Sequence, residues 1–428
     1  MRVLLLGASG LVGSALAAQL VSRGDEYIAV VHRVHVNGLA KPASTVELDI
    51  SKARDVSDWL PSLKDVDAVV NCAGVLQDSL YDSVHGVHAA GVATLFTACE
   101  RAGVRRIIHL SAVGVDRATT EFSQTKLAGE QILMQSALDW VILRPSIVIG
   151  SQAYGASALM RALAAMPLLP SIPSTGPLQP VHLDDLVSVI LFFLQPSAPV
   201  RQVVDVVGPR IWSFDQLVML LRRWLRFGPA RVWPMPRSLA GLSYRCGDLF
   251  SLLGWRPPVR TTAAREIARG AVGNPEILRE LALAPRDIED ALLATPASVQ
   301  ERWFARLYLL KPAIFILLAL FWIGTGMISL TSGWCYGMGL MHEAGVSDAT
   351  AGAIIVAGAS ADLVIGATIA WRPAARWGLY AAIAISLLYA VIGTALVPRL
   401  WNDPLGPMLK IWPIVLLHGV ALAVFDDR

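Results

Sequence analysis

Short apolar runs alternate with helical patterns along the first part of the chain. The predicted strands are Arg2–Leu6, Tyr27–Val31, Val46–Leu48, Ala68–Val70, Arg106–Leu110 and Trp140–Leu143. Helical patterns separate most of these runs, and strands that alternate with helices are typical of a parallel sheet. The pattern therefore predicts an α/β domain with a doubly wound parallel sheet, a Rossmann fold.

The last part of the chain is strongly apolar. Four stretches approach the roughly 20 residues that cross about 30 Å of hydrocarbon. They are about Pro312–Leu330, Thr350–Trp371, Trp377–Val397 and Leu409–Phe425. Since backbone polar groups in lipid must pair within the segment, we predict an all-α transmembrane four-helix bundle over residues 312–428. The head spans 1–295, and 296–311 form a linker and interface segment.

Composition supports a membrane protein. Of 428 residues, 54% are hydrophobic and 16% charged, against roughly 25% charged in soluble domains. This excludes a disordered chain, and the net charge of +3 gives no indication of a nucleic-acid partner. The four cysteines form no CxxC pair and no disulfide framework, and no metal site is predicted.

The distribution of lysine and arginine predicts the orientation. Arg302, Arg306 and Lys311 precede the first span, and Arg372 and Arg376 lie between the second and third, whereas the loop between the first two spans has neither. The N-terminal apolar run is too short for a signal peptide. By the positive-inside rule, both termini lie in the cytosol. We expect a multi-pass protein of the cell's inner (cytoplasmic) membrane with a cytosolic head.

The second span combines small residues with one carboxylate. Small residues let membrane helices pack closely. Asp362 lies near mid-depth, where a carboxylate costs several kcal/mol unless it is neutral or paired, so it should point into the bundle. A functional role and a protonated structural role both stay open, with His418 of the fourth span as the candidate partner.

A glycine-rich loop follows the first predicted strand directly. Gly7 permits the tight turn, Gly10 lets the backbone approach a pyrophosphate, and Gly13 allows close packing of helix and strand. The N-terminus of the next helix then faces the phosphates. The predicted dinucleotide contacts in this loop are Gly7, Ser9, Gly10, Leu11, Val12 and Gly13.

The end of the second predicted strand bears on the choice of cofactor. An acidic residue there binds the 2′-hydroxyl of NAD, whereas an arginine accommodates the 2′-phosphate of NADP. The strand runs into His32 and Arg33 with no acid nearby, so NADP(H) is favoured and NAD stays possible. The alternative interpretation is that Arg33 is a solvated surface residue without a role in cofactor binding. The remaining predicted cofactor contacts follow the third and fourth strands: Asp49, Ile50, Cys72, Ala73 and Gly74.

As a set, these motifs resemble the short-chain dehydrogenase/reductase superfamily, most of all the extended and atypical branch that includes the 39-kDa-type accessory subunit of respiratory complex I. The resemblance covers roughly residues 1–210. It is carried by Gly7–Gly13, Asp49, Asn71–Gly74, His109–Ser111, Lys126, Ala128–Glu130, Leu143–Pro145 and Pro180–Asp185. The tail resembles the DoxX-like membrane family in span count, length and the segment Asp403–Pro407.

The resemblance implies that Ser111 orients the substrate and that Lys126 binds the nicotinamide ribose. In the superfamily this lysine also lowers the pKa of a tyrosine four residues earlier, which exchanges a proton with the substrate. This chain has Phe122 there, and phenylalanine cannot carry a proton. Turnover would then require Ser111, Ser123, Tyr154 or water to manage the protons.

Several of these residues also have structural interpretations. In the structural interpretation, Lys126 is an exposed charge on a helix. Ser111 then hydrogen-bonds its own backbone at the end of a strand. Asp184 or Asp185 is better explained as a helix N-cap than as a catalytic carboxylate. The basic and aromatic stretch 221–237 suits either an anionic membrane surface or a solvated helix face.

Two functions remain in view. The first is a membrane-anchored NADP(H)-binding oxidoreductase with a hydrophobic, quinone-like or isoprenoid-like substrate, because tethering raises the effective concentration of the head near lipid-dissolved molecules. The second is a non-catalytic NADP(H)-binding structural, assembly or redox-sensing module of a membrane complex, with a membrane protein as partner. The lipid bilayer is an expected partner in both cases, and nucleic acid in neither.

Overall fold

The computed structural model describes residues 1–32, 39–78, 83–117 and 120–426, and divides into two compact units. The head unit comprises Met1–Leu249 and Pro257–Ala305. The membrane unit comprises Phe250–Arg256 and Arg306–Arg428.

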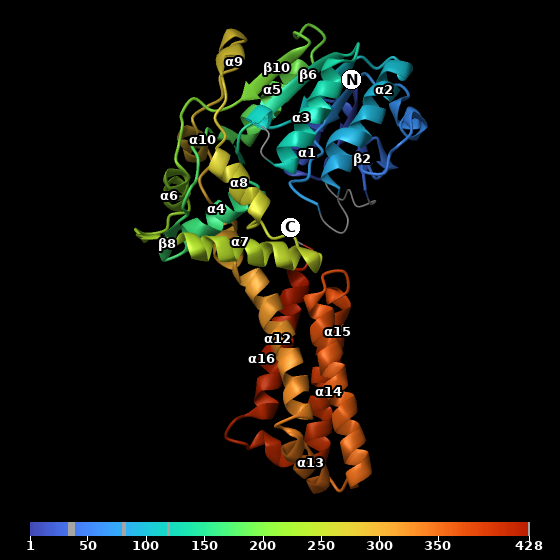
Figure 1. Cartoon of the computed structure of the whole chain (residues 1–428), viewed down its shortest axis with the longest axis vertical. Helices are drawn as coiled ribbons and strands as arrows, with labels where there is room; N and C mark the ends of the chain where they lie inside the picture. Colours follow the sequence, from blue (N-terminus) through green and yellow to red (C-terminus); the bar gives the residue numbers. More distant parts are fainter. Residues whose placement is uncertain (33–38, 79–82, 118–119, 427–428) are drawn as a thin grey trace. The chain divides into compact units, whose positions relative to one another are not determined.

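The head is built on a seven-stranded parallel sheet with the strand order β10-β6-β5-β4-β1-β2-β3. Figure 1 labels β10, β6 and β2 of this sheet. The strands are β1 (Arg2–Leu6), β2 (Glu26–Val31), β3 (Ser44–Glu47), β4 (Ala68–Asn71), β5 (Arg106–Leu110), β6 (Asp139–Pro145) and β10 (Gln202–Val206). The chain starts near the middle of the sheet and winds outward in both directions. This confirms the doubly wound Rossmann fold, and β10 is a strand that the sequence pattern did not predict.

Both faces of the sheet are buried, as a parallel sheet requires. In β1, Val3 and Leu5 join the core on one face, while Leu4 and Leu6 join the core on the other. The helices α1 (Leu11–Ser22) and α5 (Leu183–Phe193) cover the first face, and α2 (Gly91–Ala102) and α3 (Glu121–Met134) cover the second.

A third hydrophobic cluster lies in the rest of the head, a part of the chain that contains further short strands and helices. Its short strands pair as β7 (Val148–Ile149) with β9 (Val181–His182), and β8 (Leu168–Ser171) with β11 (Arg231–Pro234). Its helices are α4 (Gly155–Ala165), α6 (Phe214–Trp224), α7 (Arg237–Leu252), α8 (Thr261–Arg269), α9 (Glu276–Glu280), α10 (Ile288–Ala294) and α11 (Val299–Leu307).

The membrane unit is helical. Its helices are α12 (Leu310–Leu330), α13 (Trp334–Glu343), α14 (Asp348–Ala370), α15 (Ala375–Leu396) and α16 (Pro407–Ala423). Among the described residues, three helices are long and apolar enough to cross a membrane: Val299–Leu330, Asp348–Ala370 and Ala375–Leu396. The fourth predicted span is an apolar helix of 17 residues, somewhat short of the roughly 20 that a span needs. The short helix α13 was not predicted.

Close packing of α14 follows from its small residues. A Cβ atom on Gly366 would stand 2.9 Å from the Ala319 carbonyl oxygen of α12, and one on Gly326 of α12 would stand 2.7 Å from the Ala359 oxygen of α14. Only glycine lets the two backbones approach this far. The predicted role of the small residues is confirmed.

Asp362 points into the bundle, but not toward His418. Its side chain accepts a hydrogen bond of 3.1 Å from the Tyr389 hydroxyl. His418 instead accepts a bond of 2.8 Å from the Trp322 indole N–H. The predicted Asp362–His418 pair is therefore wrong. The Trp322 indole N–H, which can only donate, hydrogen-bonds the imidazole Nε2 of His418.

Candidate functional site

The glycine loop has the geometry of a dinucleotide cradle. Gly7 has a φ of +74°, a left-handed conformation that favours glycine. The Gly10 N–H then bonds the Gly7 carbonyl at 2.9 Å. A Cβ atom on Gly13 would stand 2.1 Å from the same carbonyl oxygen, so only glycine fits where α1 crosses the loop.

The N-terminus of α1 is free to bind an anion. Helix α1 starts at Leu11, and its N-cap residue, Gly10, offers no side-chain cap. The first N–H groups of a helix, here those of Leu11, Val12 and Gly13, have no acceptor within the helix. Ser9 is exposed just before them. These groups together can hold a pyrophosphate.

The end of β4 lies against this loop. A Cβ atom on Gly7 would come within 2.9 Å of the Ala73 nitrogen and the Cys72 oxygen. The Ala73 N–H is held by the Asn71 side chain at 3.0 Å. Cys72 and Ala73 thus lie beside Gly7, at the carboxyl edge of the sheet, where α/β folds bind their ligands. Gly74 follows them along the chain.

The turn after β3 is fixed by Asp49. The Asp49 carboxylate accepts hydrogen bonds from the Ser51 N–H at 3.0 Å and the Ser51 hydroxyl at 2.6 Å. His32 lies 3.5 Å from its second oxygen. Ile50 is next along this turn. The predicted ribose-phosphate ligand, Arg33, lies outside the described residues.

Lys126 is buried rather than an exposed helix charge. Its ammonium donates to the Leu110 carbonyl at 2.8 Å and to the Ala73 carbonyl at 3.4 Å, and the residue is 5% exposed. Burial lowers the pKa of Lys126 to about 8, and Glu130 and Cys72 only partly oppose this shift. The lysine therefore links the ends of β4 and β5, and one of its three N–H donors remains for a ligand.

Ser111 directly follows β5 and carries an uncommitted hydroxyl. Its main-chain N–H bonds the Leu143 carbonyl at 2.7 Å. The Ser111 Oγ is buried and has no hydrogen-bond partner within the described part of the chain, so it does not bond its own backbone as the alternative interpretation had it. A buried polar atom of this kind needs an explanation, and a bound substrate oxygen would supply one.

The position that holds tyrosine in the superfamily is used here for packing. The Phe122 ring stands edge-on to the His88 imidazole, with 5.5 Å between centroids. His88 was not predicted as part of the site, and the spacing of the sequence offered no signal for it. Its Nε2 accepts the Val75 N–H at 3.1 Å, and its Nδ1 lies 3.1 Å from the Thr125 hydroxyl.

Because Nε2 is an acceptor, the His88 proton is on Nδ1 and points to Thr125. Burial lowers the pKa of His88 to about 2, and nearby Lys126 adds to the shift. His88 is therefore neutral at physiological pH. It supports the position of α3 and does not replace the missing phenol as an acid.

A buried ion pair fixes α3 on the sheet. Arg144 of β6 donates to both carboxylate oxygens of Glu130, one at 2.9 Å from Nε. Glu130 is fully buried. The sequence motifs that contain these two residues were part of the family resemblance, and the structure shows what they do: they hold the helix that carries Lys126.

Helix α8 brings two further charged residues to this end of the site. Glu266 accepts a hydrogen bond from the Ser123 hydroxyl at 2.9 Å and pairs with Arg269 at 2.8 Å. Arg269 also donates to the Val113 carbonyl at 3.1 Å. Sequence reasoning missed both residues, since more than 140 positions separate them from Ser123. Ser123 is thus tied into an ion-paired network.

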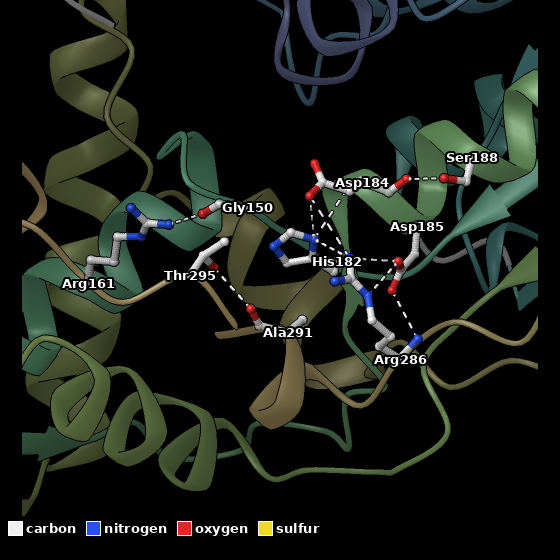
Figure 2. A network of polar contacts seen from close by, with 9 residues as sticks. All are labelled: Gly150, Arg161, His182, Asp184, Asp185, Ser188, Arg286, Ala291 and Thr295. Atoms are coloured by element: carbon white, nitrogen blue, oxygen red, sulfur yellow. Dashed lines mark hydrogen bonds and ion pairs between the residues drawn. The ribbon is translucent and has the colours of Figure 1, made fainter. Parts of the chain in front are cut away.

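Tyr154 lies on the phosphate side of the site. Its hydroxyl is 3.5 Å from the Ser9 carbonyl oxygen. The loop that carries it is held by buried Arg161, which donates to the carbonyl of Gly150 (Figure 2) and to that of Ser151. This location favours contact with the glycine loop over a role as substitute acid.

The helix N-cap near Asp184 is a neighbouring residue. Helix α5 begins at Leu183, and its cap is His182, whose Nδ1 accepts the Asp184 N–H at 3.3 Å. Asp185 instead pairs with Arg286 at 2.8 Å (Figure 2). The predicted N-cap role of Asp184 or Asp185 is therefore wrong. These are the second and third residues of α5, and their carboxylates complement the helix dipole from the first turn.

Two arginines at the start of the stretch 221–237 serve the fold of the head, whereas Arg226, Arg231 and Arg237 are exposed. Arg222 is buried and donates to the carbonyls of Ala164 and Met166 at 2.6 and 2.7 Å, which caps the end of α4. Arg223 pairs with Glu289. These two arginines stabilise the fold of the head.

Family models match both parts of the chain. Residues 7–162 match a family described as NAD(P)H-binding, and residues 319–419 match the DoxX-like family. The chain joins an NAD(P)-binding domain to a DoxX-like membrane domain. Both sequence resemblances are thereby confirmed at this level.

Curated relatives match part of the chain. The photosystem II assembly factor Ycf39 of Synechocystis is 24% identical over 56% of this chain and 72% of its own length. The alpha subcomplex subunit 9 of NADH dehydrogenase [ubiquinone] 1 from Dictyostelium discoideum is 25% identical over 50% and 61%. The sterol demethylase protein B of Methylococcus capsulatus is 27% identical over 38% and 56%. Uncharacterised mycobacterial proteins are 28% identical, but the match spans only 23% of their length.

Solved structures agree on the fold. The Bordetella bronchiseptica enzyme WbmG, in complex with NAD, aligns with a TM-score of 0.52 at 19% identity, covering 69% of this chain and 93% of that one. At this identity the likeness shows the fold alone.

Proposed function

We propose that this protein is a membrane-anchored, NADP(H)-dependent oxidoreductase. The observation that carries the proposal is the arrangement at the carboxyl edge of the sheet. The uncapped N-terminus of α1 faces outward there, and Lys126 links the ends of β4 and β5 beside Gly74. Such a cradle fits the pyrophosphate and the nicotinamide ribose of a dinucleotide.

The sequence at the end of β2 supports NADP over NAD. The strand ends at Val31 and is followed by His32 and Arg33, so the acid that would bind a 2′-hydroxyl is missing there. The Asp49 carboxylate, 3.5 Å from His32, is engaged by Ser51. Arg33 is the proposed partner of the 2′-phosphate.

A nicotinamide cofactor would supply or accept the hydride. The chain's own contribution is the placement of two groups: Ser111 Oγ to hydrogen-bond a substrate oxygen, and Lys126 to hold the ribose. With its pKa lowered to about 8, Lys126 also exchanges a proton near neutral pH, where general acids work best. Phe122 takes no part in proton transfer, so the substrate is one whose reduction depends little on a tyrosine acid.

The membrane domain supports a hydrophobic substrate. A head tethered to the bilayer acts at high effective concentration on molecules dissolved in lipid. A relative of the head is named a sterol demethylase protein, which agrees with a lipid-soluble compound. A quinone-like or isoprenoid-like molecule is the proposed class.

The proposed location is the inner membrane, with the head in the cytosol. By the positive-inside rule, the cytosolic side is the one that carries most lysines and arginines near the spans. These are Arg302, Arg306, Lys311, Arg372 and Arg376. Arg399 and Lys410 fall on the opposite side, which gives two basic residues there against five on the proposed cytosolic side.

A specific observation favours a second function, that of a non-catalytic NADP(H)-binding module. Phe122 occupies the position of the catalytic acid, and two relatives are named as an assembly factor and as a subunit of a respiratory complex. The head would then bind NADP(H) without turnover and contact a membrane-protein partner. Purified full-length protein, mixed with NADPH and a short-chain quinone, separates the two: loss of NADPH absorbance supports the enzyme, and tight binding without turnover supports the module.

A further inference from the structure

The membrane unit contains a cavity of about 200 Å³ between its helices. Side chains from α12, α14, α15 and α16 line it. The polar members are Thr325, Asp362, Ser386 and Tyr389, and the other lining residues are aromatic or aliphatic. Spaces between the helices of a bundle are frequent ligand sites, and a mostly apolar lining with a few convergent polar groups is their usual composition.

The carboxyl group of Asp362 lies well inside the bilayer region. It is eight residues before the end of α14 at Ala370, or about 12 Å along the helix axis. The residue is 6% exposed, and the Tyr389 hydroxyl donates to it at 3.1 Å. A carboxyl group at such depth is expensive and marks functional sites in membrane proteins.

One wall of the cavity is sealed by a neutral pair. The Trp322 indole donates to His418 Nε2 at 2.8 Å. The His418 proton is therefore on Nδ1, which donates to the Ile414 carbonyl at 2.7 Å. Every polar atom of this wall is satisfied, so it offers shape and an aromatic surface rather than charge.

The cavity opens toward the outer surface of the bundle. Phe321 and Tyr389 both line the cavity and are both 37% exposed. Ser386, by contrast, is 5% exposed and lies inside. A flexible apolar tail attached to a bound group can therefore pass between these aromatic side chains into lipid.

We propose that this cavity binds the ring of a lipid-soluble quinone or quinol. Cavities of about 150 Å³ accept a single six-membered ring, so the volume fits a ring but not a larger fused system. A quinol hydroxyl would donate to Asp362, and a quinone carbonyl would accept from Tyr389. The choice of a quinone rests on the substrate class of the proposed function, whereas the cavity itself is formed by the membrane unit alone.

Photolabelling tests the proposal directly. The full-length protein in lipid nanodiscs is irradiated with a benzoquinone that carries a decyl tail and a diazirine, and labelled peptides are mapped by mass spectrometry. Labels on the segments around Trp322, Asp362 and Tyr389, competed by unlabelled decyl-quinone, are expected. Labels spread over the outer faces of the helices would overturn the proposal, since that pattern means partition into lipid alone.

Matched variants make the test specific. Ser386→Leu fills the cavity and should lower specific labelling at least tenfold, and Asp362→Asn should weaken competition by the quinone several-fold. Ser360→Leu changes the same side chain on α14, where Ser360 is exposed, and should label like the parent. Equal labelling of the two leucine variants would refute the site. The midpoint of thermal unfolding of the membrane unit checks folding in the same samples. Absence of NADPH binding from the parent protein would refute only the proposed function.

Discussion

Lys126 donates a hydrogen bond of 2.8 Å to the main-chain carbonyl of Leu110, the last residue of β5. A helix residue thereby fixes the end of a strand at the edge where a dinucleotide would bind. Since the ammonium is buried and bonds only backbone oxygens among the described residues, its removal would disturb the site and leave the surface unchanged.

Replacement of Lys126 by methionine should weaken NADPH binding by about tenfold or more, because one charge-assisted hydrogen bond to the ribose is worth roughly 1.5–3 kcal/mol. Methionine keeps the length and the apolar stem of the side chain. The exposed Lys64 provides the control, and Lys64→Met should bind like the parent. Equal NADPH affinity in the parent protein, Lys126→Met and Lys64→Met would show that Lys126 does not bind the cofactor.

The affinity for NADPH should fall as the pH rises from 7 to 9. The pKa of Lys126 is lowered to about 8 by burial, so the ammonium is present below this pH and is lost above it. The protonated form is the better partner for the anionic cofactor. Binding titrations at constant ionic strength should show the decline in the parent protein and a flat profile in Lys126→Met. A flat profile in both would contradict the assignment.

Gly13→Ala should abolish nucleotide binding. The new Cβ atom would stand 2.1 Å from the Gly7 carbonyl oxygen, so α1 would have to move away from the loop. At Gly241, on α7, nothing lies within 4 Å of the same atom. Gly241→Ala should therefore bind NADPH normally. Equilibrium binding of NADPH compares the two variants. Equal affinities would contradict the role of Gly13 in the site.

Glu130→Gln should destabilise the head by about 3 kcal/mol, since it leaves the Arg144 guanidinium without its buried partner. The exposed pair Arg105–Asp139 is the matched control, and Asp139→Asn should cost less than about 1 kcal/mol. Thermal unfolding followed by tryptophan fluorescence compares them. Similar midpoints would show that the Glu130–Arg144 pair does not hold α3 in place.

Phe122→Leu should keep NADPH turnover within about threefold, because the aromatic ring carries no proton. The loss of its edge-on contact with His88 should lower stability by about 1 kcal/mol. Initial rates with a short-chain quinone measure the first effect. A near-complete loss of turnover with intact NADPH binding would show that the ring takes part in the reaction.

The features that could be predicted from the sequence are those that a local pattern of residues determines. The strand Arg2–Leu6 and the glycine loop could be located because a buried parallel strand and its first turn each have a local signature. The contact of Arg269 with Ser123 could not, since it joins α8 to α3 across most of the head. Asp362 was correctly placed inside the bundle, whereas its partner depends on the rotation of α15, which an all-apolar helix pattern does not encode.

The most direct test of the central claim is a calorimetric titration of the full-length protein, in detergent, with NADPH and then with NADH. The account predicts saturable binding of NADPH, about tenfold or more tighter than that of NADH, and its loss in Gly13→Ala. Absence of binding for both nucleotides to folded protein would contradict the account.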